Sequence, residues 1–281
     1  MRLLYTMTIL FLVVVHPVFA AEGQSSSLYD RVVKTKVLRC AYTLYPGFVD
    51  RDPNTGEMSG LSYDLVNAIG SQLGIKVEWT DEVGVDVIFE GFKNQRYDMA
   101  CSGYNLTPSR AWAADATMPI FYTPSYLYVR AGEARFKSED DLDSPNVSVA
   151  AMDGEATSLV ATERFPKARV ESLMGMAPAT DRFEMVASGK ADFTPMEASI
   201  GNDYMAKNPG KIMQFGAHPI ITMPSVIYVP QNERQLKALL DVGIQSAQSS
   251  GAMERIVRKY AKHSGDILLP AVPYQLRDLA N

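Results

Sequence analysis

Apolar residues along the chain follow two alternating patterns. Short apolar runs of β-strand type alternate with longer segments in which apolar residues recur every three or four positions. In one such segment Leu61, Leu65 and Ile69 share a helical face, and Gly74 marks the end of the predicted helix. The predicted strands of this first series are residues 37–42, 75–79 and 97–101, with a further helix at 87–94.

A second series repeats this alternation further along the chain. Strands are predicted at residues 146–151, 169–173 and 191–194, with helices at 155–164 and 179–188 between them. The last part, residues 233–262, has helical periodicity and a break at Gly251. Strands that alternate with helices in this way predict an α/β fold built on parallel sheets.

An internal echo suggests how the two series are organised. Phe89-Glu90 and Asp98 recur as Phe183-Glu184 and Asp192, each offset by 94 residues. Chance could produce such an echo, but its position supports two similar lobes. Strand-like segments at 126–129 and 225–229 flank the second series, as two crossover strands would. We therefore predict a first lobe of residues 21–128 plus 226–281 and a second lobe of residues 129–225, with a ligand cleft between them.

The N-terminus has the pattern of an export signal. Arg2 precedes a mostly apolar run over residues 3–15, and Val18-Phe19-Ala20 resembles a cleavage site. A run of this length is too short to span a bilayer. A buried N-terminal helix is the alternative. No cysteine follows the run, so a lipid anchor is not expected. We predict a signal peptide over residues 1–20 and a free protein in the periplasm.

Composition excludes several classes of function. The formal net charge is −5, which argues against a nucleic-acid partner. Two cysteines cannot build a disulfide scaffold or a four-thiolate zinc site, and the three histidines do not cluster. We therefore expect no metal and no cofactor. Cys40 and Cys101 lie on strands that would be neighbours in a 2-1-3 order, so either a disulfide or two buried thiols is compatible with the sequence.

The residues richest in candidate chemistry follow the third predicted strand. The strand is expected to end at Ser102, and a loop then leads to Thr107-Pro108, which is typical of a helix start. Arg110 lies in the first turn of that helix. Free amides at a helix N-terminus favour an anion, and a guanidinium can bind a carboxylate at two points. The alternative is a solvated surface arginine, but its position beyond a strand end favours ligand binding.

In order and spacing, several motifs resemble family 3 extracellular solute-binding proteins of polar amino-acid ABC transporters. The motifs are Tyr45-Pro46-Gly47-Phe48, Gly60 to Leu65, Gly91 to Asp98, Thr107 to Arg110, and Gly189 to Asp192. The resemblance implies a type II periplasmic-binding-protein fold, in which two α/β lobes are joined by two crossover strands. It also implies a monomer that captures a small zwitterion, such as an amino acid, for a membrane permease.

The resemblance also implies roles for individual residues. Arg110 would bind the ligand's α-carboxylate with help from Gly103 and Asn105, Tyr45 would cover the ligand, and Glu197 would bind the α-amino group. Tyr42, Phe48 and Trp79 are weaker candidates for a ring against the ligand. Ser102, Glu155 and Thr157 complete the predicted site.

Two departures from the family pattern affect the second lobe. The family commonly has Asp at the position of Glu197 and a hydroxyl residue at the position of Ala156. Glu155 adds a second possible acid, which leaves open a ligand with a second positive group.

An enzyme is the alternative function. The cyclohexadienyl dehydratases are relatives that dehydrate arogenate or prephenate in the same cleft, and they resemble this chain even at Glu133-Ala134-Arg135-Phe136. Their general-acid Glu aligns three residues after Glu197, at Ile200, which cannot transfer a proton. We therefore predict a binding protein rather than an enzyme.

Overall fold

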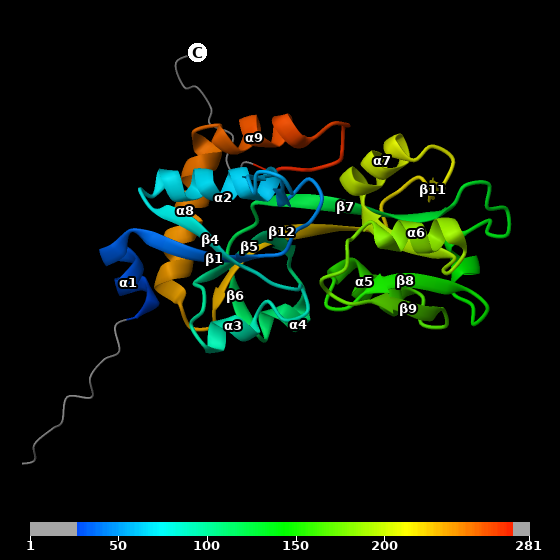
Figure 1. The fold of residues 1–281 in the computed structure, drawn as a ribbon, viewed down its shortest axis with the longest axis horizontal. Coiled ribbons are helices and arrows are strands. Elements are labelled where there is room, and N and C mark those ends of the chain that lie inside the picture. Colours follow the sequence, from blue (N-terminus) through cyan, green and yellow to red (C-terminus); the bar gives the residue numbers. More distant parts are fainter. Residues whose placement is uncertain (1–26, 272–281) are drawn as a thin grey trace, which may run out of the picture.

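The computed structural model describes residues 27–271, so the predicted signal peptide lies outside the described residues. Within this range, ten strands form one curled sheet whose main path is β4-β1-β5-β12-β7-β10-β8-β9. The elements lie in two groups side by side (Figure 1). We use first lobe for the group around β4-β1-β5 and second lobe for the group around β10-β8-β9. The predicted lobe boundaries at 128/129 and 225/226 remain a prediction.

The first lobe has a small parallel sheet with helices packed on it. Strand β1 (Val37–Tyr42) lies between β4 (Lys76–Glu82) and β5 (Met99–Asn105), which is the 2-1-3 order expected from the sequence. Helices α2 (Leu61–Gln72), α8 (Arg234–Ser249) and α9 (Ala252–Tyr260) pack together over it, as Figure 1 shows. The smaller elements of this lobe are α1 (Leu28–Thr35), β2 (Asp50–Arg51), β3 (Met58–Ser59), α3 (Glu90–Lys93), α4 (Pro108–Ala111) and β6 (Ala114–Ala116).

The second lobe repeats the plan on a smaller scale. Strand β8 (Ser148–Met152) lies between β9 (Arg169–Leu173) and β10 (Phe193–Glu197), parallel to both. The remaining elements are the 3₁₀ helix η1 (Glu139–Leu142), α5 (Ala156–Arg164), α6 (Asp181–Ser188), α7 (Ala198–Lys207) and β11 (Ile212–Phe215).

Two ten-residue strands connect the lobes. Strand β7 (Phe121–Arg130) pairs with β10 and β11 of the second lobe, whereas β12 (Ile221–Pro230) pairs with β5 and β6 of the first. The two strands also pair with each other, antiparallel, between Ser125 and Ile221 at one end and Phe121 and Ser225 at the other. They include the segments expected to cross between the lobes.

The sequence echo corresponds to a repeated structural feature. The backbone N–H of Asp98 donates to Arg39 O at 2.9 Å, and Asp98 Oδ2 accepts from Arg39 N at 2.7 Å. Asp192 makes the same exchange with Ser148, at 2.8 Å in each direction. In each lobe, therefore, an aspartate just before the third strand is anchored to the backbone of the first strand.

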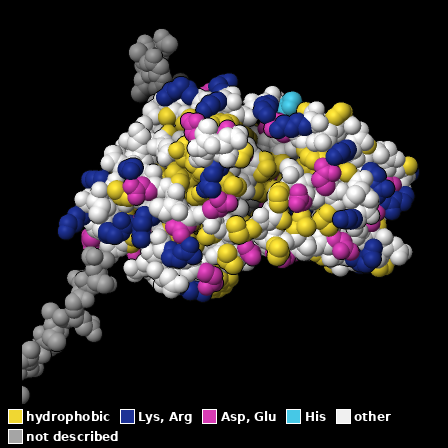
Figure 2. Space-filling view, in the orientation of Figure 1, with side chains coloured by type: hydrophobic (Ala, Val, Ile, Leu, Met, Phe, Trp, Pro, Cys, Tyr) yellow, Lys and Arg dark blue, Asp and Glu magenta, His cyan; other side chains and the backbone are white. Residues whose placement is uncertain are grey.

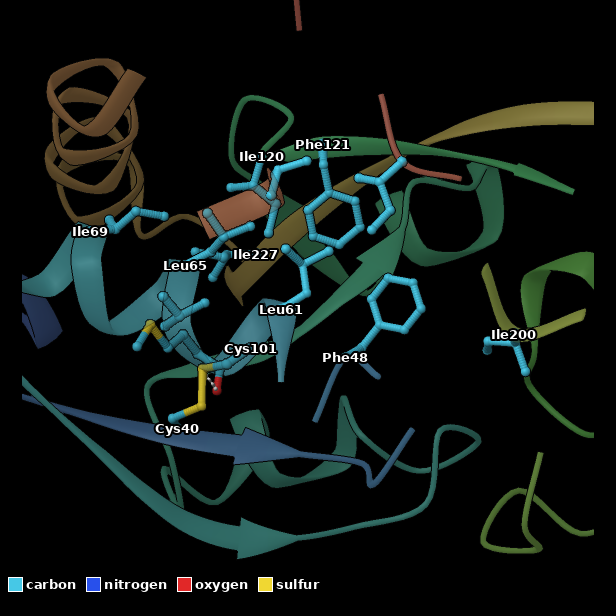
Figure 3. Packing of buried hydrophobic residues seen from close by; sticks show 14 of the residues in the cluster. Cys40, Phe48, Leu61, Leu65, Ile69, Cys101, Ile120, Phe121, Ile200 and Ile227 are labelled. Carbon is cyan, nitrogen blue, oxygen red and sulfur yellow. Dashed lines mark hydrogen bonds between the residues drawn. A yellow bond between two sulfur atoms is a disulfide. The ribbon is translucent and has the colours of Figure 1, made fainter. Parts of the chain in front are cut away.

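Buried apolar residues of α2 form the centre of the first-lobe core. Leu61, Leu65 and Ile69 are at most 1% exposed and pack over the sheet in Figure 3. The same cluster contains Cys40 and Cys101, which form a disulfide with Cα atoms 5.9 Å apart. The structure thus selects the bridged alternative that the sequence had left open beside two free thiols.

Three local predictions were wrong or incomplete. The helix expected at 87–94 shortens to α3, because residues 85–89 form turns. Strand β5 does not end at Ser102 but continues to Asn105, because β12 pairs with it there. Helices α1 and α7 were missed. α1 is short and surface-lying, and only Val32 within it is fully buried.

Candidate ligand-binding site

A cavity of about 50 Å³ lies between the two lobes. In Figure 2, hydrophobic side chains gather around the middle of the molecule, where the lobes meet. Seven of the eight predicted site residues line the cavity: Tyr45, Ser102, Gly103, Asn105, Arg110, Glu155 and Glu197. Thr157 is not among the lining residues and is fully buried behind Glu155. The structure therefore brings together predicted residues that are separated by up to 152 positions in the sequence.

Arg110 reaches across the cavity from the start of α4. Thr107 caps this helix by accepting from the Arg110 backbone N–H at 3.3 Å, and Pro108 occupies the first helical position. The guanidinium donates from Nη1 to Asn105 O and from Nη2 to Gly154 O, each at 2.8 Å. Arg110 is 7% exposed, so the alternative of a solvated surface arginine is wrong. These bonds use two of the five N–H donors of the guanidinium within residues 27–271.

The bond to Gly154 also shows how closely the lobes approach each other. Gly154 belongs to the turn before α5 in the second lobe, with φ +75°, and a Cβ atom there would lie 2.5 Å from Asp86 Cα of the first lobe. Only glycine permits this approach. The lobes are therefore in contact beside the cavity, with Arg110 bonded across the junction.

Glu197 faces the cavity from the opposite lobe. It is the last residue of β10 and directly precedes α7. Glu197 is 3% exposed, so its carboxyl group is buried rather than solvated. Burial, helped by the negative charge of Glu155 and opposed by Arg182, raises the pKa of Glu197 to about 7. Its Oε2 accepts a hydrogen bond from the Tyr45 hydroxyl at 2.9 Å.

Glu155, the second acid, is already paired. As the N-cap of α5, its Oε2 accepts from Ser158 N at 3.1 Å and from the Thr157 hydroxyl. The Arg182 guanidinium lies 3.2 Å from the same oxygen. Burial alone would raise the pKa of Glu155, but the Arg182 charge and these hydrogen bonds together lower it. Glu155 is therefore ionised at neutral pH and its charge is compensated within the second lobe.

Arg182 is a residue that sequence analysis did not single out. It lies in the first turn of α6 and is 0% exposed. Nothing in the local pattern marks it, because a charged residue near a helix start is typical of a solvated position. Its burial depends on the packing of α6 against β7, β8 and β10.

The floor of the cavity is polar and includes residues from both crossing strands. Asn105 Nδ2 donates to Thr123 Oγ1 of β7 at 3.2 Å. Ser225 of β12 is 1% exposed, and its hydroxyl finds no hydrogen-bond partner within the described residues. Thr123 and Ser225 were missed because the sequence marked these strands only as connections. An unpaired buried hydroxyl beside a cavity is available to a polar ligand.

Ser102 and Gly103 shape the wall of the first lobe rather than offering free side chains. Ser102 Oγ accepts from Thr43 N at 2.9 Å and donates to Thr43 O at 3.1 Å. Gly103 has φ +73°, and a Cβ atom there would lie 2.8 Å from both the Phe121 ring and Ser62 Oγ.

Two of the four candidate aromatic residues border the cavity. Tyr45 and Phe48 line it, with ring centroids 5.8 Å apart. Tyr42 and Trp79 are not among the lining residues and pack edge-to-face on each other at 5.7 Å.

Within residues 27–271, no group of three or more His, Cys, Asp or Glu side chains is arranged to hold a metal ion. In the same range no helix is long and apolar enough to cross a bilayer.

Two α/β lobes joined by two strands, with a cavity of charged, polar and apolar side chains at their junction, are the arrangement expected of a protein that captures a small solute. Residues 38–263 match the bacterial extracellular solute-binding proteins, family 3, and the chain belongs to this family. The fold is that of the type II periplasmic-binding proteins, as the sequence motifs implied.

Individual relatives include both binding proteins and an enzyme. A probable amino-acid ABC transporter-binding protein of Haemophilus influenzae is 22% identical over 91% of this chain and 95% of its own length. Cyclohexadienyl dehydratase of Pseudomonas aeruginosa is 24% identical over 86% of this chain and 88% of its own. Among solved structures, an ancestral amino acid-binding protein described as a precursor of cyclohexadienyl dehydratase has a TM-score of 0.73. It is 24% identical and covers 84% of this chain and all of its own.

Proposed function

We propose that this protein binds a free amino acid, or a close zwitterionic relative, between its lobes. The observation that carries the proposal is the placement of Arg110 and Glu197 on opposite lobes, both lining one cavity. Arg110 would bind the α-carboxylate with its remaining N–H groups. Glu197 would accept the α-ammonium group, and the polar floor would complete the site. The amino-acid ABC transporter-binding relative supports this choice of ligand.

Closure of the lobes would strengthen both charge pairs. Each pair gains when water leaves the cleft, because the local dielectric constant falls. Strands β7 and β12 would act as the hinge, with residues 21–128 plus 226–281 moving against residues 129–225. The bonds from Arg110 to Gly154 and from Tyr45 to Glu197 would hold the closed form.

We propose that the mature protein begins at Ala21 and works as a free monomer in the periplasm, where it delivers its ligand to a membrane ABC permease. The predicted signal peptide and the family's extracellular role support this location. Intact-mass measurement of exported material should give a chain without residues 1–20 and without lipid. Retention of the leader, or recovery only in membranes, would contradict the proposal.

Dehydratase activity is the second candidate, favoured by one specific observation. Glu197 is a buried carboxyl in the cleft with a pKa of about 7, which is a property of general acids. Against it, the position expected for the acid holds Ile200, which is 3% exposed. We therefore propose no enzymatic step. Incubation with arogenate and prephenate should release no phenylalanine or phenylpyruvate, and release at a steady catalytic rate would reverse this choice.

A thermal-shift screen of the twenty amino acids tests the binding proposal. A ligand at about 100 times its dissociation constant adds about 2.7 kcal/mol of stability, which raises the melting temperature by several degrees. At least one amino acid should do so. The proposal fails if none does while the protein is folded at the start of the scan.

A further inference from the structure

Two positive and two negative side chains lie at the cavity or directly behind its wall. Arg110, Glu155 and Glu197 line the cavity, and Arg182 lies directly behind Glu155. If a ligand's two backbone charges meet Arg110 and Glu197, the remaining pair is Glu155 with Arg182. The state of that second pair determines what charge the ligand's side chain can carry.

Arg182 is fixed in place on every side. Its Nε donates to Ala179 O at 3.4 Å and its Nη1 to Glu155 Oε2 at 3.2 Å. Its Nη2 donates to the Tyr45 hydroxyl at 3.3 Å and to Met196 Sδ at the same distance. The side chain is 0% exposed, and a guanidinium stays protonated at any ordinary pH. Its positive charge is therefore a constant feature of the second lobe.

We infer that Arg182 is a specificity-determining residue, which neutralises Glu155 and so restricts the site to amino acids with uncharged side chains. The inference rests on the proposed function and names its substrate class. The sequence left open a ligand with a second positive group, because an unpaired Glu155 would favour one. The pairing of Glu155 with Arg182 argues against such a ligand.

A charged ligand side chain would lose its water in the cavity and would need an opposite charge that the cavity does not offer. A positively charged side chain would leave water and meet Glu155 with Arg182 only 3.2 Å behind it, so attraction and repulsion largely cancel. A negatively charged side chain would meet the Glu155 carboxylate first, because Glu155 lines the cavity and Arg182 does not. Either charge would be buried without compensation, whereas an uncharged side chain incurs no such penalty.

Pairs of amino acids with matched shape and different charge test this inference. Calorimetric titration compares citrulline with arginine, glutamine with glutamate, and asparagine with aspartate. Wild type should bind the uncharged member of each pair at least about tenfold more tightly, equivalent to about 1.4 kcal/mol. Binding confined to smaller uncharged amino acids, with no charged amino acid bound, supports the inference as well.

Two substitutions should shift this preference in opposite directions. Arg182→Gln leaves Glu155 uncompensated and should shift the arginine-to-citrulline affinity ratio at least tenfold towards arginine. Glu155→Gln leaves Arg182 uncompensated and should shift the glutamate-to-glutamine ratio at least tenfold towards glutamate. The double variant removes both charges and should return both ratios close to those of wild type.

The control is Arg135→Gln, which removes an arginine of the same lobe that is 53% exposed and pairs with Glu133 and Asp192. The affinity ratios of this control should match those of wild type.

If either single variant fails to fold, wild type and the double variant still test the inference. It is overturned if wild type binds arginine or glutamate as tightly as the uncharged partner, or if folded single variants keep wild-type ratios. If no amino acid binds wild type at all, the proposed function itself has failed.

Discussion

The Tyr45 hydroxyl donates a hydrogen bond to Glu197 Oε2 at 2.9 Å and thereby joins the two lobes across the cavity. The carboxylate proposed to receive a ligand's ammonium group is thus also part of the contact between the lobes. Arg110 has the same double position, since it lines the cavity and donates to Gly154 of the other lobe. In the proposed function, ligand recognition and lobe contact therefore use the same two charged residues.

Ligand affinity should depend on pH through Glu197. Burial, together with the charge of Glu155, raises the pKa of Glu197 to about 7, and only the ionised form attracts an ammonium group. Below pH 7 a proton competes with the ligand, so affinity should fall by about tenfold per pH unit. Calorimetry between pH 5.5 and 8 measures this change. Glu197→Gln should bind weakly with little pH dependence, and a flat wild-type profile would contradict the assignment.

The free energy of unfolding of the unliganded protein should fall as pH rises, whereas ligand affinity should rise. The pKa of Glu197 rises from an ordinary value of 4.5 in the unfolded chain to about 7 in the folded protein. Between these values the folded state holds a proton that the unfolded state has lost, so stability falls as pH rises. This acid should therefore destabilise the protein by about 3 kcal/mol above pH 7. Urea unfolding should show Glu197→Gln to be more stable than wild type at pH 7.5 and similar to it at pH 4.5. If Glu197→Gln were less stable than wild type at both pH values, the raised pKa of Glu197 would be contradicted.

The disulfide should contribute substantially to folding. Cys40 and Cys101 are both fully buried and close a loop across a sequence separation of 61 residues. In the chain-entropy description such a link stabilises the folded state by about 4 kcal/mol. Reduction of wild type and the Cys40→Ala/Cys101→Ala variant should lower the urea midpoint by comparable amounts. An unchanged midpoint after complete reduction would show that the bridge carries little of the stability.

Ligand binding should make the molecule more compact in solution. The lobes are connected by β7 and β12. Bonds from Arg110 and Tyr45 link them at the cavity, and bonds from Asn202 to Asp266 and from Lys262 to Asp203 link them elsewhere. Small-angle scattering with a ligand confirmed by calorimetry should give a smaller radius of gyration than the unliganded protein. Superimposable curves at saturation would argue against a closing cleft.

The parts of the fold that depend on local sequence were predictable. The apolar spacing of Leu61, Leu65 and Ile69 identified α2, and Thr107-Pro108 identified the start of α4. The 94-residue echo reflected a repeated aspartate exchange, because each lobe anchors its third strand in the same way.

Features that depend on contacts between distant segments could not be predicted. The end of β5 at Asn105 is set by pairing with β12, more than a hundred residues later. The burial of Arg182 and the unpaired hydroxyl of Ser225 result from how whole elements pack. The motif resemblance indicated the two charged groups proposed to face the ligand, but it did not reveal that Arg182 lies behind Glu155 and pairs with it.

The central claim is that Arg110 and Glu197 bind opposite ends of one zwitterion, and one set of titrations tests it. Calorimetry compares the best amino acid from the screen with its N-acetyl and carboxamide forms, on wild type, Arg110→Ala and the exposed-site control Arg258→Ala. Loss of one partner of a buried charge pair costs about 2–5 kcal/mol, so each blocked ligand and Arg110→Ala should bind about 30-fold or more weakly. Arg258→Ala should bind like wild type. Wild-type affinity of Arg110→Ala for the unmodified amino acid, or of wild type for both blocked forms, would contradict the claim.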